Sequence, residues 1–143
     1  MVSIELLDRY NWEACLTIQL TPEQDRFVPS VLYSLAQARF ENLTPYGIRL
    51  DGKMVGMLMY GQFSAGLCWI NRILVDREHQ GLGIGQKAME QLLFQLRRKR
   101  QCAEIRTSYV PENLAAAHFF AKLGFRPVES PLEDEVVVQL LSR

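Results

Sequence analysis

Gln80-Gly81-Leu82-Gly83-Ile84-Gly85 is the stretch that decides the fold. It follows a largely apolar run at residues 70–75 and precedes an amphipathic segment at residues 86–96, which predicts a strand, a loop and a helix in that order. Glycines lack a Cβ atom, so their main-chain N–H groups can approach a ligand closely. The first turn of a helix adds unpaired N–H donors and a partial positive charge. The stretch therefore predicts a phosphate-binding site at the start of this helix.

The spacing of the glycines argues against two common phosphate loops. A P-loop ends in Gly-Lys-Ser/Thr, whereas Gly85 is followed by Gln86-Lys87-Ala88. A dinucleotide loop has the spacing Gly-x-Gly-x-x-Gly and an acidic residue about twenty positions later, where this chain has Gln101 and Cys102. A third interpretation stays open at this point, in which the glycines only allow the helix to pack closely on the sheet.

Length and charge narrow the class of protein. A chain of 143 residues fits one domain, residues 1–143, with 48% hydrophobic and 22% charged residues, as in ordinary globular proteins. The formal net charge is zero, so there is no global electrostatic reason to bind nucleic acid. No apolar run reaches the length of a membrane span, and the first residues do not have the pattern of a signal peptide. We therefore expect a cytoplasmic protein without a membrane or nucleic-acid partner.

The cysteines are Cys15, Cys68 and Cys102. They form no close pair and no Cys-x-x-Cys motif, so the sequence indicates neither a disulfide nor a zinc site. We expect reduced thiols and no metal ion.

Hydrophobic periodicity and turn residues predict the remaining elements. These are a strand at residues 3–7, a helix at 12–21, an interrupted helix at 22–38, strands at 46–50, 54–63 and 67–75, a helix at 86–96, a strand at 103–110, a helix at 111–123, and strands at 125–129 and 135–141. Asp51-Gly52 predicts a hairpin turn between two of the strands, and Gly124 predicts the end of the last helix. This order indicates a layered α/β or α+β sheet.

Two motifs together resemble those of the GNAT superfamily of acetyl-CoA-dependent N-acetyltransferases. The first is Gln80-x-x-Gly83-x-Gly85, preceded by Ile73-Leu74-Val75-Asp76. The second is Asn113-x-x-Ala116-x-x-Phe119-Phe120-x-x-x-Gly124-Phe125. Their order and spacing are more specific than a glycine loop alone. Weaker similarity at residues 23–28, 34–38 and 55–60 resembles the bacterial diamine and spermidine acetyltransferase branch.

The resemblance implies a central mixed, mostly antiparallel sheet of six to seven strands flanked by about four helices. It also implies that acetyl-CoA is the co-substrate and that the main chain of the loop holds its diphosphate. The residues expected to bind it are Leu74, Val75, Gln80, Gly81, Leu82, Gly83, Ile84, Gly85, Asn113 and Phe119. Asn113 has an equally good interpretation as a plain helix N-cap.

The resemblance implies three candidates for catalysis. The N–H of Val75 would polarise the thioester carbonyl, a role in which one hydrogen bond is worth about 3 kcal/mol. Many relatives have a tyrosine acid at the position of Phe120, which has no proton to give, so Tyr109 is the substitute candidate. Tyr109 also has a structural interpretation, as a strand residue packed on the sheet. Asn71 replaces an acidic residue found in relatives and would orient a water that relays the amine proton.

The expected acceptor is the primary amine of a small molecule, such as a di- or polyamine. Glu23, Asp25 and Glu41 are candidates to bind it, although solvated helix faces explain these carboxylates equally well. Two alternatives stay open: acetylation of a protein N-terminus or lysine, and a noncatalytic acyl-CoA sensor. Relatives are often dimers, so a homodimer is also an option.

Overall fold

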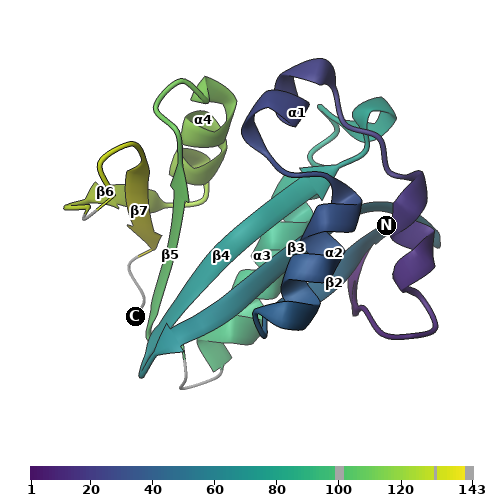
Figure 1. The fold of residues 1–143 in the computed structure, drawn as a ribbon, viewed down its shortest axis with the longest axis horizontal. Coiled ribbons are helices and arrows are strands. Elements are labelled where there is room, and N and C mark those ends of the chain that lie inside the picture. Colours follow the sequence, from purple (N-terminus) through teal and green to yellow (C-terminus); the bar gives the residue numbers. More distant parts are fainter. Residues whose placement is uncertain (99–101, 131, 141–143) are drawn as a thin grey trace.

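The computed structural model describes residues 1–98, 102–130 and 132–140, and its seven strands form one sheet (Figure 1). The strand order is β1-β2-β3-β4-β5-β7-β6, with every neighbouring pair antiparallel except β4 and β5, which are parallel. The strands are β1 (Val2–Leu6), β2 (Thr44–Leu50), β3 (Lys53–Ser64), β4 (Leu67–Val75), β5 (Glu104–Tyr109), β6 (Phe125–Val128) and β7 (Val136–Leu140). The predicted mixed, mostly antiparallel sheet is confirmed.

Helices cover both faces of this sheet. The 3-10 helix η1 (Trp12–Thr17) and the helices α1 (Pro22–Phe27) and α2 (Val31–Phe40) lie on one side. The helices α3 (Ile84–Arg98) and α4 (Leu114–Lys122) bury side chains in the core on the other side, and a second 3-10 helix, η2 (Arg77–His79), joins β4 to the glycine loop. Each face therefore has its own buried cluster, and the sheet separates the two.

Local sequence signals explain where the first helices begin. Thr21 caps α1 by accepting a hydrogen bond from the N–H of Gln24, and Pro22 occupies the first helical position. Ser30 caps α2 in the same way by accepting from the N–H of Tyr33. The interrupted helix predicted from residue 22 onward is thus two helices, each with its own N-cap, and the helix predicted before it is the 3-10 helix η1.

Two predicted turns are confirmed by backbone conformation. Asp51 and Gly52 have φ angles of 50° and 89°, the positive values that the tight turn between β2 and β3 requires. Gly124 ends α4 at a φ of 100°, which a residue with a side chain rarely adopts.

The apolar stripe of α3 forms much of the larger core cluster. Its buried residues are Ile84, Ala88, Met89, Leu92, Leu93 and Leu96, at the helical spacing seen in the sequence. Burying each of the larger side chains contributes about 1.5–3 kcal/mol, so this face fixes the helix on the sheet. The start of α3 is thereby held next to the end of β4.

The structure contradicts the expectation that all cysteines are reduced. Cys68 and Cys102 form a disulfide, while Cys15 is a buried free thiol. The two bonded residues are 34 positions apart, yet their Cα atoms are 5.2 Å apart. Cys68 is on β4 beside Ile105 of β5, and Cys102 lies just before β5. The parallel pairing of β4 with β5 brings them together, which sequence spacing did not reveal.

Burial raises the pKa of the Cys15 thiol to about 11.

In the described ranges, every helix is too short or too polar to cross a bilayer.

Candidate active site

The parallel strands β4 and β5 pair with each other at one end only. Their register comprises Leu67↔Glu104, Cys68↔Ile105 and Trp69↔Arg106. Immediately beyond, the buried Thr107 hydroxyl donates a 2.9 Å hydrogen bond to the carbonyl of Ile70. Past this point β5 continues to pair with β7, whereas β4 has no β5 partner (Figure 1). The two strands therefore form a wedge that opens toward the glycine loop.

The register of β4 with β3 shows which main-chain groups point into this wedge. The N–H of Asp76 donates to the carbonyl of Val55, so the main chain of Asp76 is directed toward β3. Alternate residues of a strand direct their main-chain groups to opposite edges. Leu74 therefore also faces β3, while Ile73 and Val75 face the wedge. The main chain of Leu74 is therefore directed to β3, which does not fit the role expected for it, and Ile73 is the residue beside Val75 that faces the wedge.

The glycine loop presents its main chain to open space. Gly81 and Gly83 both have φ angles of 77°, and a Cβ atom added to either would meet nothing within 4 Å. In the described part of the chain, the N–H groups of Gly81, Leu82 and Gly83 have no hydrogen-bond acceptor. These donors stand at the N-terminus of α3, where the helix dipole favours an anion. The loop therefore fits a diphosphate group.

Gly85 has different surroundings. A Cβ atom here would lie 3.4 Å from Phe119 Cε1, 3.5 Å from Val75 Cγ2 and 3.7 Å from Ile73 Cδ1. These are ordinary van der Waals distances, so the first turn of α3 packs against β4 and α4 with room for a methyl group at this position. Close helix–sheet packing therefore does not require a glycine at position 85, while the ligand-exposing interpretation fits Gly81 and Gly83.

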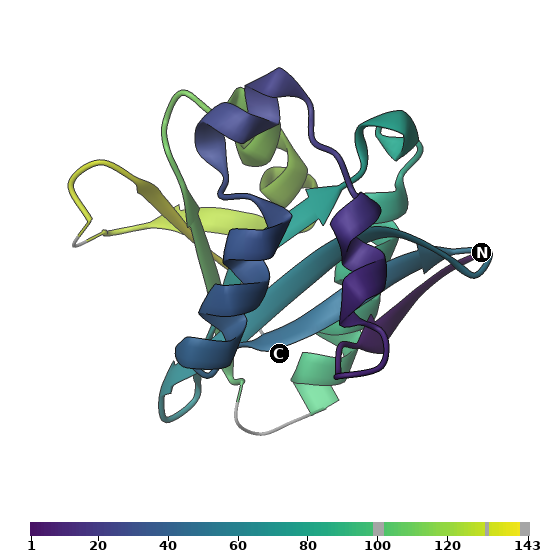
Figure 2. The ribbon, with the colours of Figure 1, turned by 45° about the vertical axis from the view of Figure 1, so that its right-hand side comes forward.

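Side chains tie the loop to α1. Gln80 donates from Nε2 to the carbonyl of Val75 at 2.9 Å and also to Oε1 of Gln24 on α1. The N–H of Arg77 donates to the carbonyl of Gln19 at 2.7 Å, just before α1. The end of β4, the loop and α1 therefore form one hydrogen-bonded unit, which stands near α4 at the open end of the wedge (Figure 2).

Asp76 anchors the segment that leads from β4 into the loop. Its carboxylate accepts hydrogen bonds from the N–H groups of Gln19 (2.9 Å) and Glu78 (3.1 Å) and contacts Nδ1 of His79 at 3.1 Å. Burial alone would raise the pKa of this carboxyl, but the bonds from Gln19, His79 and Glu78 outweigh it, so the pKa lies below its ordinary value. His79 is thus a structural partner of Asp76.

We expect Asp76→Ala to lower the free energy of unfolding by about 2–3 kcal/mol at neutral pH, because three hydrogen-bond donors lose a charged acceptor. A depressed folded-state pKa stabilises the protein above the ordinary Asp pKa of about 4, and this contribution disappears as the pH falls through the folded-state pKa. Urea unfolding of both proteins across this acidic range checks the prediction. A difference that persists undiminished at the lowest pH would contradict it.

Asn71 is the extra residue of a β-bulge. Met59 pairs with Arg72 and Tyr60 pairs with Ile70, which leaves Asn71 without a partner on β3. Its Oδ1 atom is buried and accepts no hydrogen bond from any described residue. The Oδ1 atom lies 3.7 Å from the position of a Cβ on Gly61, and Cδ2 of Leu43 lies only 2.6 Å from that same position, so the side chains pack closely around Gly61. An unpaired buried acceptor costs about 1–3 kcal/mol, which makes it a candidate contact for a donor.

The predicted acid Tyr109 lies at the end of β5 and packs against the larger core cluster. Its ring stacks on Phe120, with centroids 6.4 Å apart and an angle of 5° between the ring planes. Phe120 itself is buried and contacts Phe125 edge to face. The ring of Tyr109 therefore has a packing role, and the catalytic role of its hydroxyl stays a prediction.

Asn113 and Phe119 place α4 beside the loop. Asn113 is the N-cap, with Oδ1 accepting from the N–H of Ala116 at 3.1 Å. Cε1 of Phe119 lies 3.4 Å from where a Cβ of Gly85 would be, and the ring meets that of Phe120 edge to face, with centroids 5.1 Å apart. The N-cap interpretation of Asn113 is confirmed, while contact of either residue with a cofactor stays a prediction.

The three predicted substrate carboxylates are not gathered in one place. Glu23 and Asp25 are exposed in the first turn of α1, and Glu41 is exposed at the C-terminus of α2. The length of α2, about 15 Å for ten residues, separates the two groups. Arg72 of β4 holds α2 in place by donating hydrogen bonds to Ser34 and Gln37 of that helix. Burial lowers the pKa of the Arg72 guanidinium.

Comparison with known proteins agrees with this geometry. The model of the acetyltransferase (GNAT) family matches residues 8–125. The chain belongs to this family. It is 26% identical over 133 residues to the spermine/spermidine N(1)-acetyltransferase of Bacillus subtilis, covering 87% of this chain and 88% of that protein. The resemblance to this branch, and the assignment as an N-acetyltransferase, are confirmed.

Two solved structures share the fold of this GNAT chain. The ribosomal-protein-S18-alanine N-acetyltransferase of Escherichia coli has a TM-score of 0.76 at 22% identity, with 100% of this chain and 96% of that chain covered. The paia N-acetyltransferase of Thermoplasma acidophilum, solved in complex with coenzyme A, has a TM-score of 0.73 at 13% identity, with 99% of each chain covered. At such identities the likeness extends to the fold alone.

Three residues of this site had no role assigned from the sequence, although Ile73 and Asp76 stand in the first motif. Ile73 directs its main chain into the wedge, Thr107 bridges the strands where they separate, and Asp76 anchors the loop. Asp76 had a partial signal, as a carboxylate directly after a buried strand. The main-chain direction of Ile73 and the hydrogen bond of Thr107 had no sequence signal, because strand register and direction decide them. In the described ranges no three His, Cys, Asp or Glu side chains are grouped to hold a metal ion.

Proposed function

We propose that this GNAT acetyltransferase transfers an acetyl group from acetyl-CoA to the primary amine of a small molecule, with di- and polyamines as the first candidates, by direct attack within a ternary complex. One observation supports acetyl-CoA as the acetyl donor. The open N–H groups of the glycine loop lie next to the main chain of Val75 at the edge of the wedge. The similarity to the Bacillus subtilis spermine/spermidine enzyme supports the acceptor class.

The main chain performs most of the proposed binding. The N–H groups of residues 80–85 and the dipole of α3 bind the diphosphate, and Ile73 and Val75 offer strand-like hydrogen bonds to the pantetheine arm. Acetyl-CoA supplies an activated thioester. The N–H of Val75 stabilises the negative charge that develops on its carbonyl oxygen, which is worth about 3 kcal/mol when the donor is preorganised.

The amine must lose a proton before it can attack. An alkylammonium with a pKa near 10.4 is uncharged in only about one molecule in 10³ at pH 7. Asn71 has no basic group, but its unpaired Oδ1 accepts a hydrogen bond from the amine or from a water that relays the proton. We therefore assign to Asn71 the positioning of this proton path. The carboxylates Glu23, Asp25 and Glu41 remain in the proposal only as surface groups that attract a cationic acceptor.

A panel of acceptors tests the function. Steady-state thiol release from acetyl-CoA should be measured with spermidine, spermine, putrescine, amino acids and peptides. We expect turnover with at least one small amine. Turnover with peptides alone would replace the proposal by protein acetylation, and coenzyme A binding without turnover on any amine would replace it by an acyl-CoA sensor. The cytoplasmic location stays a prediction.

Tyr109→Phe tests the source of the proton for the departing thiolate. We expect kcat to fall about tenfold or more, because general acid catalysis typically contributes about 10²- to 10⁴-fold. The substitution keeps the ring that stacks on Phe120, so a purely structural role would leave kcat unchanged. Tyr46→Phe is the control, since it removes a hydroxyl from a ring stacked on Tyr60. An unchanged rate and pH profile for Tyr109→Phe would assign Tyr109 to packing alone.

A further inference from the structure

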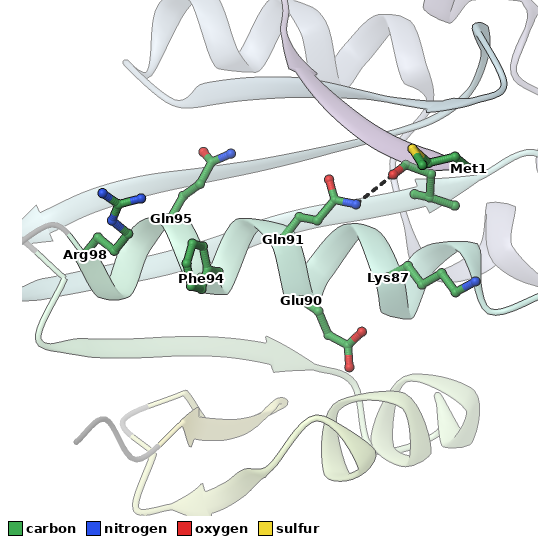
Figure 3. A pocket seen from close by; sticks show the side chains of 8 residues that line it. Met1, Lys87, Glu90, Gln91, Phe94, Gln95 and Arg98 are labelled. Atoms are coloured by element: carbon green, nitrogen blue, oxygen red, sulfur yellow. Dashed lines mark hydrogen bonds between the residues drawn. The ribbon is translucent and has the colours of Figure 1, made fainter.

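A groove with a volume of about 970 Å³ lies between α3 and β1, and no residue of the candidate active site lines it (Figure 3). Its lining residues are Met1, Val2, Lys87, Glu90, Gln91, Phe94, Gln95 and Arg98. Gln91 donates from Nε2 to the carbonyl of Val2 at 2.7 Å, which fixes the floor of the groove. The exposed flank of α3 therefore stands beside the edge strand of the sheet.

An aromatic side chain stands in the middle of this flank. Phe94 is 63% exposed, although it belongs to a helix whose other large apolar side chains are buried. The guanidinium carbon of Arg98 lies 5.7 Å from the centroid of the Phe94 ring. Exposed aromatic residues beside arginine are enriched at protein interfaces.

The charges around Phe94 are self-complementary. Glu90 and Arg98 are one helical turn before and after Phe94, on the same face of α3. In Figure 3 they point to opposite sides of Phe94. A two-fold axis through Phe94 would set two copies of α3 antiparallel, with Glu90 of each opposite Arg98 of the other. Symmetric homodimers have this isologous form.

We propose that this flank of α3 is the interface with a second copy of the chain. The two Phe94 rings meet at the axis, and two Glu90–Arg98 ion pairs flank them. The interface lies apart from the acetyl-transfer site, so an experiment that disproves the interface leaves the proposed function untouched. Residues of one i, i+4 row on each helix supply the contacts, which corresponds to a common way of packing helices.

Charge reversal tests this interface, because two opposite reversals should each weaken the dimer and should compensate for one another when the two variants are mixed. We expect sedimentation equilibrium over a concentration series to show a dimer for the natural chain. Glu90→Arg and Arg98→Glu should each raise the dimer dissociation constant about tenfold or more, because each places like charges opposite one another twice. Mixing the two variants should restore a heterodimer, since one chain then carries both cations and the other both anions.

Lys122→Glu is the matched control, because it makes the same type of charge change on α4, away from this flank. Circular dichroism and coenzyme A binding should be unchanged in all variants, which separates loss of the interface from loss of fold. A monomeric natural chain, single variants that dimerise normally, or a mixture of the two variants that stays monomeric would each overturn the proposal.

Discussion

Gly83→Glu is expected to abolish coenzyme A binding while the protein stays folded. The loop offers N–H donors to a diphosphate, and a carboxylate in their midst would repel that group and compete for the same donors. A Cβ atom at Gly83 meets no other atom within 4 Å, so the new side chain has room and the core is not disturbed. Titration calorimetry with coenzyme A should show a loss of affinity of about 100-fold or more.

The control for this variant must introduce the same backbone strain. Gly83 has a φ of 77°, so any side chain there is strained whatever the charge. Gly52 has a φ of 89°, is equally open, and lies in the turn between β2 and β3. Gly52→Glu therefore adds the same strain and charge away from the loop, and it should bind coenzyme A normally. Unchanged affinity in Gly83→Glu would remove the loop from the mechanism.

Loss of the Cys68–Cys102 disulfide is expected to lower the free energy of unfolding by about 4 kcal/mol, the chain-entropy value for a loop closed over 34 residues. The bond also joins β4 to the segment before β5 at the closed end of the wedge. The double variant Cys68→Ala/Cys102→Ala should therefore unfold at a markedly lower denaturant concentration than the oxidised natural chain.

The reductant provides the control for this experiment. Dithiothreitol should destabilise the natural chain toward the level of the double variant and leave the double variant unchanged. Cys15 is a buried free thiol in both proteins, so it contributes equally to the two measurements. Equal stability of the natural chain with and without reductant, together with two free thiols at these positions, would show that the bond does not form in solution.

Local signals predicted most of the fold. The helical spacing of Ile84, Ala88 and Leu92 defined the buried face of α3, and Asp51-Gly52 defined the hairpin turn. Such features depend on residues that are neighbours in the sequence or one helical turn apart, so a single sequence reveals them. The glycine loop is a local feature too, and its open donors follow from its own backbone conformation.

Other parts of the site depend on contacts between distant segments. Cys68 and Cys102 meet because a parallel crossover brings their strands together. Asn71 acquires a buried, unpaired oxygen because β4 has one residue more than β3 at that point. The acidic residues of α1 and the C-terminus of α2 could be taken as one cluster in the sequence, yet α2 holds them apart.

The sequence by itself determined the family, the glycine loop and the position of the helix start, because the main-chain conformation of a short segment is set by its own residues. Only the tertiary structure decided that Ile73 and Val75 face the wedge instead of Leu74, that Gly85 lies against β4 and α4, and that two cysteines are bonded. The physical reason is that strand register and the separation of β4 from β5 result from packing across the whole sheet, which no local pattern encodes.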